Sequence, residues 1–394
     1  MRLPNSPVAV IVIAQLFGTS LWFSTNSAAG SLMAAWGLTE ADIGLLTNAV
    51  QLGFISGTLI FALTGLADRF EASRIFTACA LLGALFNALF AFAADGLMSG
   101  LPLRFAVGFC LAGVYPLGMK LVVSWVPERA GTALAQLVGM LTLGSALPHG
   151  VRLAGADWSW QSTLLVSSIL PCIAAFMVWR LGDGPHLRRT PGTHHLRLGR
   201  VLTAFTIPQF RASALGYFGH QWELYAFWTL TPALVIAAGL AAPGTPLLSG
   251  LSFLIIGIGS LGCILGGWWS RSIGSARVAA VALAVSALCC ALFPITATFA
   301  PTGLLLILLI WGTSVVADSP HFSALSAKAC PPEFVGSALT LQNALGFAIT
   351  MVSIQIGTVI VDTLGTFTAW LLLPGPLFGL WGLCPLWREK PRQT

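Results

Sequence analysis

Residues 65–74 read "GLADRFEASR", a short charged connection between two long apolar runs. A similar connection, "GWWSRSIGSAR", stands at residues 267–277, again after an apolar run. Farther along, "YPLGMKLVVSWVPERAG" at residues 115–131 resembles "SPHFSALSAKACPPEFVG" at residues 319–336. The paired stretches keep a nearly constant offset, and each pair joins apolar runs that follow in the same direction. The chain is therefore predicted to be a parallel duplication of a six-helix unit, the arrangement expected when two bundles rock about a central site.

Composition places the chain in a membrane. Of its 394 residues, 56% are hydrophobic and 8% are charged, and the mean hydropathy is +0.86. A soluble domain carries about 25% charged residues. Apolar stretches of about 20 residues, long enough to cross a bilayer as a helix, recur along the chain. These stretches are continuous rather than alternating, so an all-α polytopic membrane protein is expected and a β-barrel is not.

Charges, prolines and glycines divide the apolar runs into twelve predicted transmembrane helices. They are expected at residues 8–29, 43–65, 75–94, 100–125, 131–154, 161–181, 208–237, 248–269, 277–298, 302–328, 336–360 and 366–387. We expect an N-terminal six-helix bundle at residues 1–181, a cytoplasmic central loop at 182–207 and a C-terminal six-helix bundle at 208–394.

The basic residues set the expected orientation, because cytoplasmic connections are enriched in Lys and Arg. With the N-terminus in the cytoplasm, all 19 basic residues except Arg104 and Arg152 fall in or near cytoplasmic connections. Both termini are therefore predicted to be cytoplasmic, and the first apolar run is read as an uncleaved span. The expected location is the cell membrane, which is the inner membrane in a Gram-negative bacterium.

The charged connections resemble those of the major facilitator superfamily. "GLADRFEASR" is similar to the family's signature loop after its second span, and "RFAVG" at residues 104–108 resembles its span-four motif. The resemblance implies twelve helices in two bundles, a monomer, and a cytoplasmic charge network that acts as a gate. Its candidate residues are Gly65, Asp68, Arg69, Arg74, Glu128, Arg129, Arg271 and Arg277.

Polar residues in the spans give candidates for a substrate cavity. On the first span, Gln15, Thr19, Trp22 and Asn26 are spaced to share one helix face. Such a stripe also fits polar contacts that hold neighbouring helices together. In the family, spans one, four, seven and ten line the cavity, which favours a functional face. Further candidates are Gln51, Arg104, Tyr115, Trp222, Tyr225 and Trp228. Arg104 fits an anion-binding role or a structural role as a donor to helix backbones.

Four ionisable residues are candidates for proton coupling, because a charge at bilayer depth is costly and faces a cavity or a partner. His220 and Glu223 are three residues apart on the seventh span, and Asp318 and His321 repeat this spacing on the tenth. Glu223 is the main candidate for a group that exchanges a proton. A structural pair that fixes helix packing is the alternative.

We therefore expect a secondary active transporter of a small solute that works by alternating access and is driven by a proton gradient, without a cofactor. The alternatives are a facilitated uniporter and, in another class, a membrane sensor or enzyme. The sequence has no HExxH motif, nucleophile elbow or P-loop, which argues against an enzyme and an ATP-driven pump. It also lacks cysteine and histidine spacing typical of a metal site. The expected partners are the solute and the lipid bilayer, with no nucleic acid.

Overall fold

The computed structural model describes residues 6–187, 202–296, 301–331 and 335–388. Within these ranges the chain is helical, without a strand, and its helices follow one another as twelve apolar segments. Nine stretches are long and apolar enough to cross a membrane, and one of them, at residues 335–388, contains two of the twelve segments. The shorter Pro7–Leu21 and the more polar helix α12 (Pro208–Ala237) complete the set. The predicted fold class is confirmed.

The helices form two compact units, and the first contains residues 1–195 and 241–257. Its elements are α1 (Pro7–Gly18), η1 (Thr19–Leu21), α2 (Ser24–Ser27), α3 (Ala29–Trp36), α4 (Glu40–Thr64), α5 (Leu66–Arg69), α6 (Ala72–Ala93), α7 (Leu97–Leu111), α8 (Tyr115–Trp125), η2 (Pro127–Arg129), α9 (Ala130–Ala154), α10 (Trp160–Leu181) and α13 (Pro246–Gly257). Helices α4, α7, α6 and α10 pack in that order. This unit extends the predicted N-terminal bundle by α13, which packs along α9.

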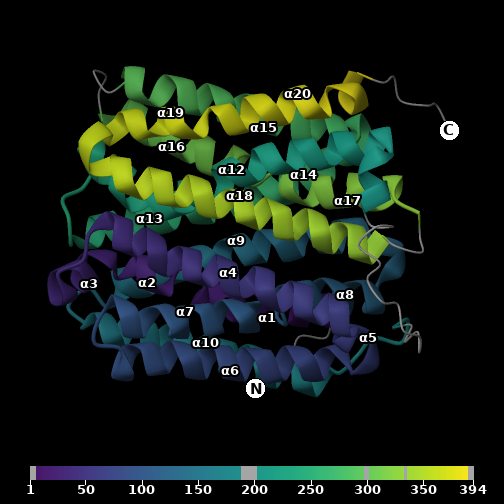
Figure 1. The fold of residues 1–394 in the computed structure, drawn as a ribbon, viewed down its shortest axis with the longest axis horizontal. Coiled ribbons are helices and arrows are strands. Elements are labelled where there is room, and N and C mark those ends of the chain that lie inside the picture. Colours follow the sequence, from purple (N-terminus) through teal and green to yellow (C-terminus); the bar gives the residue numbers. More distant parts are fainter. Residues whose placement is uncertain (1–5, 188–201, 297–300, 332–334, 389–394) are drawn as a thin grey trace. The chain divides into compact units, whose positions relative to one another are not determined.

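The second unit contains residues 196–240 and 258–394. Its described elements are η3 (Thr203–Thr206), α12, α14 (Gly259–Ile273), α15 (Ser275–Ile295), α16 (Pro301–Ser314), α17 (Ser319–Ala329), α18 (Val335–Leu364), η5 (Gly365–Thr368), α19 (Ala369–Leu372) and α20 (Pro374–Arg388). Helix α12 packs most extensively against α20, α18 and α17 (Figure 1). Part of the predicted central loop, residues 188–201, lies outside the described residues.

Each unit contains a pair of helices that meet through glycines. In the first unit, a Cβ atom on Gly53 of α4 would lie 2.0 Å from the carbonyl oxygen of Phe105 on α7. In the second, a Cβ atom on Gly262 of α14 would lie 2.1 Å from the carbonyl oxygen of Thr313 on α16. Each glycine is followed four residues later by another, Gly57 or Gly266, which keeps the backbones close. The sequence duplication thus has a counterpart in packing.

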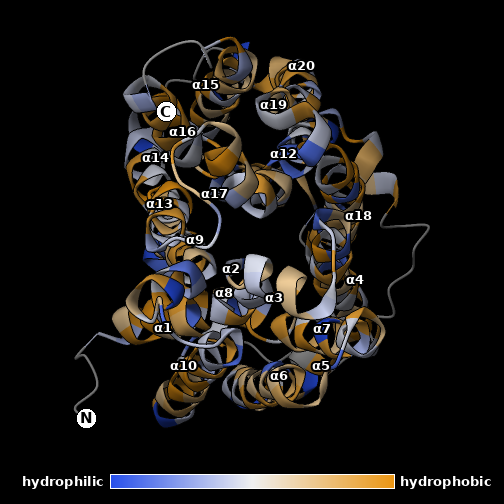
Figure 2. Cartoon of the chain, turned by 90° about the vertical axis from the view of Figure 1, so that its left-hand side faces the viewer, coloured by the Kyte–Doolittle hydropathy of each residue, from blue (hydrophilic) through white to orange (hydrophobic). Residues whose placement is uncertain are grey.

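The outward faces of the helices carry large apolar side chains. Phe92 on α6 is 74% exposed and Trp268 on α14 is 69% exposed. The colour of hydrophobic residues predominates along the helix ribbons in Figure 2. Apolar patches of this extent occur on surfaces that contact lipid or another protein. Together with the twelve apolar segments, they make this a multi-pass membrane protein.

Candidate functional site

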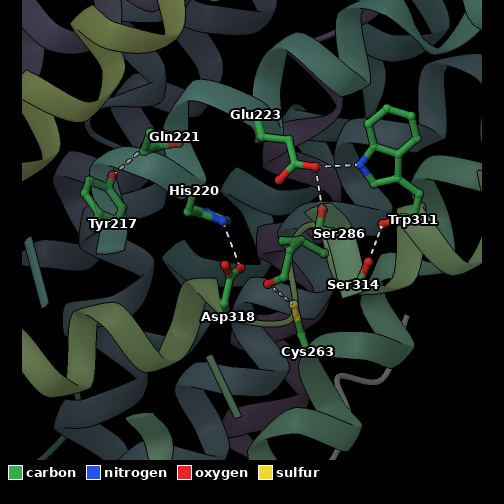
Figure 3. A network of polar contacts seen from close by, with 10 residues as sticks. Tyr217, His220, Gln221, Glu223, Cys263, Ser286, Trp311, Ser314 and Asp318 are labelled. Atoms are coloured by element: carbon green, nitrogen blue, oxygen red, sulfur yellow. Dashed lines mark hydrogen bonds and ion pairs between the residues drawn. The ribbon is translucent and has the colours of Figure 1, made fainter. Parts of the chain in front are cut away.

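The carboxylate of Glu223 lies near the middle of α12 and is the centre of a buried polar cluster in the second unit. The residue is 1% exposed. The Trp311 indole N–H on α16 donates to one carboxylate oxygen at 2.6 Å, and the Ser286 hydroxyl on α15 donates to the same atom. Figure 3 shows the Trp311 and Ser286 contacts, and the Cys290 thiol adds a longer contact of 3.2 Å. Among the described residues, no hydrogen bond or ion pair reaches the other oxygen.

A second polar contact joins α12 to the start of α17. Nδ1 of His220 lies 2.8 Å from a carboxylate oxygen of Asp318, and the two side chains are 1% and 2% exposed (Figure 3). The sequence spacing suggested His220 with Glu223 and Asp318 with His321 as neighbours. Instead, His220 pairs across two helices. His321 lies against α14, where its Nε2 would be 3.3 Å from a Cβ atom on Gly266.

Three partners of Glu223 were not among the predicted site residues: Ser286, Cys290 and Trp311. Ser286 and Cys290 are four residues apart, so both project from one face of α15. Trp311 lies inside an apolar segment rather than at its end, and a buried indole N–H requires an acceptor. That mid-span position is the sequence signal that could have identified it.

In the first unit, the end of the first segment contacts α4 through side-chain hydrogen bonds. The Trp22 indole N–H donates to Oε1 of Gln51 at 3.3 Å, and the Asn26 amide donates to Oγ1 of Thr47 at 2.9 Å. The Trp22 ring lies 5.0 Å from Phe54, whose ring stacks 6.5 Å from Tyr115. The predicted residues Trp22, Asn26, Gln51 and Tyr115 therefore belong to one amide-and-aromatic cluster.

The other two residues of the predicted face, Gln15 and Thr19, lie closer to the N-terminal end of the same segment. The Thr19 hydroxyl donates to the backbone carbonyl of Gln15 at 2.8 Å, so it serves its own helix. The Gln15 side chain is fully buried against Gly118 of α8. Within the described residues, neither its amide nitrogen nor its oxygen has a hydrogen-bond partner. Among the described residues, Gln15 is thus the member of the face with both hydrogen-bonding groups unused, whereas on Asn26 only Oδ1 lacks a partner.

Arg104 on α7 is engaged with the interruption of the first segment. One terminal guanidinium nitrogen donates to Oδ1 of Asn87 at 2.8 Å and to Ser24 at 3.2 Å. The other donates to the carbonyl oxygens of Leu21 and Trp22, at 3.1 and 2.8 Å. These carbonyls lie where η1 ends, and carbonyls at a helix end need donors from outside the helix. The geometry matches the structural alternative for Arg104.

The predicted aromatic residues of α12 point to different neighbours. The Trp222 indole N–H donates to the carbonyl oxygen of Leu371 at 2.8 Å, which directs this ring to α19. Tyr225 lies 5.2 Å from Trp228 and 5.0 Å from Phe347 of α18, measured between ring centroids. Tyr225 and Trp228 thus form one cluster with α18, and Trp222 is separate from it.

The charged connections lie at the ends of the helices. Arg74 forms an ion pair with Glu71, and the backbone N–H of Ser73 donates to Asp183 at 2.8 Å. Glu71, Arg74 and Asp183 help to line a cavity of about 330 Å³. The remaining predicted gate residues are the turn glycine Gly65 and the exposed or half-buried Arg69, Glu128, Arg129, Arg271 and Arg277. The side chain of Asp68 lies outside the described residues.

The two clusters differ in chemistry. The first unit offers amides and aromatic rings, which suit hydrogen bonding and stacking with a solute. The second holds a buried carboxylate whose partners are all uncharged, beside an imidazole–carboxylate pair. Among the residues that the structure describes, no group of three or more His, Cys, Asp or Glu has an arrangement that could hold a metal ion.

Comparison with known proteins gives concordant matches. The family profile described as Major Facilitator Superfamily matches residues 11–354. The 3-(3-hydroxy-phenyl)propionate transporter of Escherichia coli K12 is 29% identical over 154 residues, covering 39% of this chain and 38% of that protein. The 4-hydroxybenzoate transporter PcaK of Pseudomonas aeruginosa is 26% identical over 227 residues, covering 56% of this chain and 48% of that protein. The matches span less than half the length of these curated relatives.

A solved structure matches over almost the full chain. The crystal structure of a D-xylose-proton symporter superposes with a TM-score of 0.77, covering 98% of this chain and 97% of that one. The sequence identity is 14%. At this identity the likeness establishes the fold.

Proposed function

Because the chain belongs to the Major Facilitator Superfamily, we propose that it is a secondary active transporter that moves a small solute by alternating access and couples this movement to protons. The fold and the transporter relatives support the transport part of the proposal. We propose that the protein is a monomer in the cell membrane. The distribution of its basic residues supports a cytoplasmic location for both termini.

The proposal for proton coupling rests on the surroundings of Glu223. Its hydrogen-bond partners Ser286, Trp311 and Cys290 are uncharged, so no fixed positive charge compensates the ionised carboxylate. All three converge on one oxygen, and among the described residues no hydrogen bond occupies the second oxygen, where a proton would bind. An uncompensated charge in a dry interior is costly, whereas the protonated acid is neutral. Proton binding therefore changes the energy of this site substantially.

The relatives suggest which solutes to test first. They are named for 3-(3-hydroxy-phenyl)propionate and 4-hydroxybenzoate, which are hydroxylated aromatic acids. The cluster of Trp22, Gln51 and Tyr115 has a ring surface and amide groups that suit such a molecule. We propose this class as the leading candidate substrate.

Uptake by proteoliposomes under an imposed pH gradient tests the proposed function. Radiolabelled 4-hydroxybenzoate is added to vesicles containing the purified protein, with either side made acidic. We expect one direction of the gradient to raise the initial rate and a protonophore to remove the gain. Weak acids also cross lipid unaided, so protein-free vesicles supply the baseline. Protein-dependent uptake that ignores the gradient would identify a facilitated uniporter instead.

A further inference from the structure

The tenth segment is interrupted in the middle of the second unit. Helix α16 ends at Ser314 and α17 begins at Ser319, with Pro320 in its first turn. The intervening residues form turns. In these turns the backbone N–H of Val315 donates to the carbonyl oxygen of Trp311 at 2.8 Å, and the backbone N–H of Ser319 donates to the carbonyl oxygen of Val316 at 3.1 Å. The thiol of Cys263 on α14 also donates to the Val316 carbonyl at 3.4 Å. The interruption is thus a compact connection between the two half-helices.

The unbroken helix α12 holds this segment at three levels. Above the interruption, Glu223 accepts from Trp311 of α16, and at the interruption His220 pairs with Asp318. Below it, the Ser213 hydroxyl donates to the carbonyl of Phe322 on α17 at 3.1 Å. From the upper contact to the lower one, the residue numbers fall along α12 and rise along the tenth segment, so the two run antiparallel. The upper two are three residues apart on α12, or about 4.5 Å along its axis.

The middle contact has the features of a rigid anchor. The His220 ring lies 6.1 Å from Tyr217 and 5.7 Å from Phe322, measured between centroids, so aromatic rings confine it. Nδ1 of His220 and Oδ1 of Asp318 lie at ion-pair distance, 2.8 Å, without the alignment of a hydrogen bond. Removing one partner of a buried pair leaves the other without compensation, which makes such pairs costly to open.

We propose that the His220–Asp318 pair is a positioning element, which fixes the interruption of the tenth segment so that the Trp311 indole N–H reaches Glu223. Asp318 follows Trp311 in the chain, on the far side of the interruption. The hydrogen bonds of the intervening turns link the position of Asp318 to that of α16. The inference rests on the proposed function in one respect, namely that Glu223 takes up a proton. It separates the buried ionisable groups by role: Glu223 carries the proton, and His220 and Asp318 orient its donor.

The C=O stretching band of protonated Glu223 reports this contact directly. A hydrogen bond to a carbonyl oxygen lowers its stretching frequency, so losing the Trp311 donor raises the frequency. Infrared difference spectra of the purified protein between acidic and alkaline buffer isolate the band, and Glu223→Gln identifies it by its loss. Trp311→Phe calibrates the shift that follows when the indole donor is absent.

The test compares variants of the pair with a packing control. His220→Asn and Asp318→Asn are each expected to raise the Glu223 band frequency in the direction that Trp311→Phe does. The exchanged pair, His220→Asp with Asp318→His, retains both groups and is expected to restore the wild-type position. Ser213→Ala removes the lower contact between the same two helices and is expected to leave the band unmoved.

The outcomes separate the inference from the proposed function. A Glu223 band that shifts in Trp311→Phe but stays at its wild-type frequency in both single variants overturns the positioning role. If the single variants do not fold, the exchanged pair decides, and a shifted band there counts against the inference. An acid-minus-alkaline spectrum without any band sensitive to Glu223→Gln contradicts the proton site itself.

Discussion

The two units place a buried charge in opposite kinds of surroundings. Arg104 in the first unit makes four hydrogen bonds, two of them to backbone carbonyls. Glu223 in the second has donors on one oxygen, all of them from uncharged groups. Fixed carbonyl partners suit a group that stays charged and structural. An acid with a free oxygen and no compensating charge suits a group that gains and loses a proton.

Arg104→Lys is expected to destabilise the protein although the charge is retained. A lysine ammonium cannot reproduce the planar fork that serves Asn87 and the carbonyls of Leu21 and Trp22 together. Unsatisfied buried acceptors make a loss of about 2 kcal/mol a reasonable expectation. The midpoint of thermal unfolding in detergent should fall by several degrees. Arg180→Lys, at an exposed site in the last turn of α10, is the matched control and should unfold with the wild type.

Sequence patterns identified Glu223, His220 and Asp318, but not the pairing of His220 with Asp318 or the partners of Glu223. A charge inside an apolar run is visible in the sequence, because it breaks the composition of its own helix. Which helix supplies the partner depends on packing, and neither Trp311 nor Ser286 is near Glu223 in the chain. The spacing of His220 and Glu223 allowed a pair on one helix. In the structure, His220 instead pairs with Asp318 at the start of α17.

At the scale of elements, the positions of the helices were largely predictable and their interruptions were not. Charges and glycines end most segments within a few residues of the predicted limits, as at Gly65 and Gly274. The interruption at residues 112–114 lies in apolar sequence, and the one at 315–318 lies inside a single predicted span although Asp318 and Pro320 mark its end. Their carbonyls and N–H groups are satisfied by turns and by neighbouring helices, which a single-helix pattern does not reveal.

The close helix pairs predict a strong effect of adding one methyl group. Gly53→Ala would place Cβ 2.0 Å from a carbonyl oxygen of α7, and Gly262→Ala would place it 2.1 Å from one of α16. Backbone cannot move aside as a flexible side chain can, so each variant should reduce the yield of monodisperse protein in size-exclusion chromatography. Gly131→Ala and Gly336→Ala, where nothing lies within 4 Å of the new atom, are the controls. Equal yields for all four variants would contradict the packing described.

At the scale of the whole molecule, the signature connection predicts a variant that affects the transport cycle. The resemblance of this connection to the family motif implies that Asp68 belongs to a charge network that holds one conformation and releases it during transport. Asp68→Asn should slow turnover of labelled solute in proteoliposomes more than it weakens apparent affinity. Asp95→Asn, an exposed site between α6 and α7, serves as control. Unchanged turnover in Asp68→Asn would remove the gate role.

The duplication and the membrane class followed from composition and the repeated connections, since these are properties of the chain as a whole, and the orientation stays a prediction from the basic residues. Substrate recognition is a property of particular side chains brought together by folding. Gln15 illustrates the limit: the sequence places it on a polar face, and the structure adds that its amide is buried with its hydrogen-bonding groups unused.

The most direct test is gradient-driven solute uptake by proteoliposomes that contain Glu223→Gln. Asp362→Asn, which makes the same chemical change at an exposed carboxylate near the end of α18, is the matched control. We expect the control to accumulate solute as the wild type does. The Glu223→Gln protein should fold and lose the response to the pH gradient, because glutamine cannot exchange a proton at that site. Wild-type gradient-driven rates in Glu223→Gln would contradict the assignment of Glu223 as the proton-coupling residue.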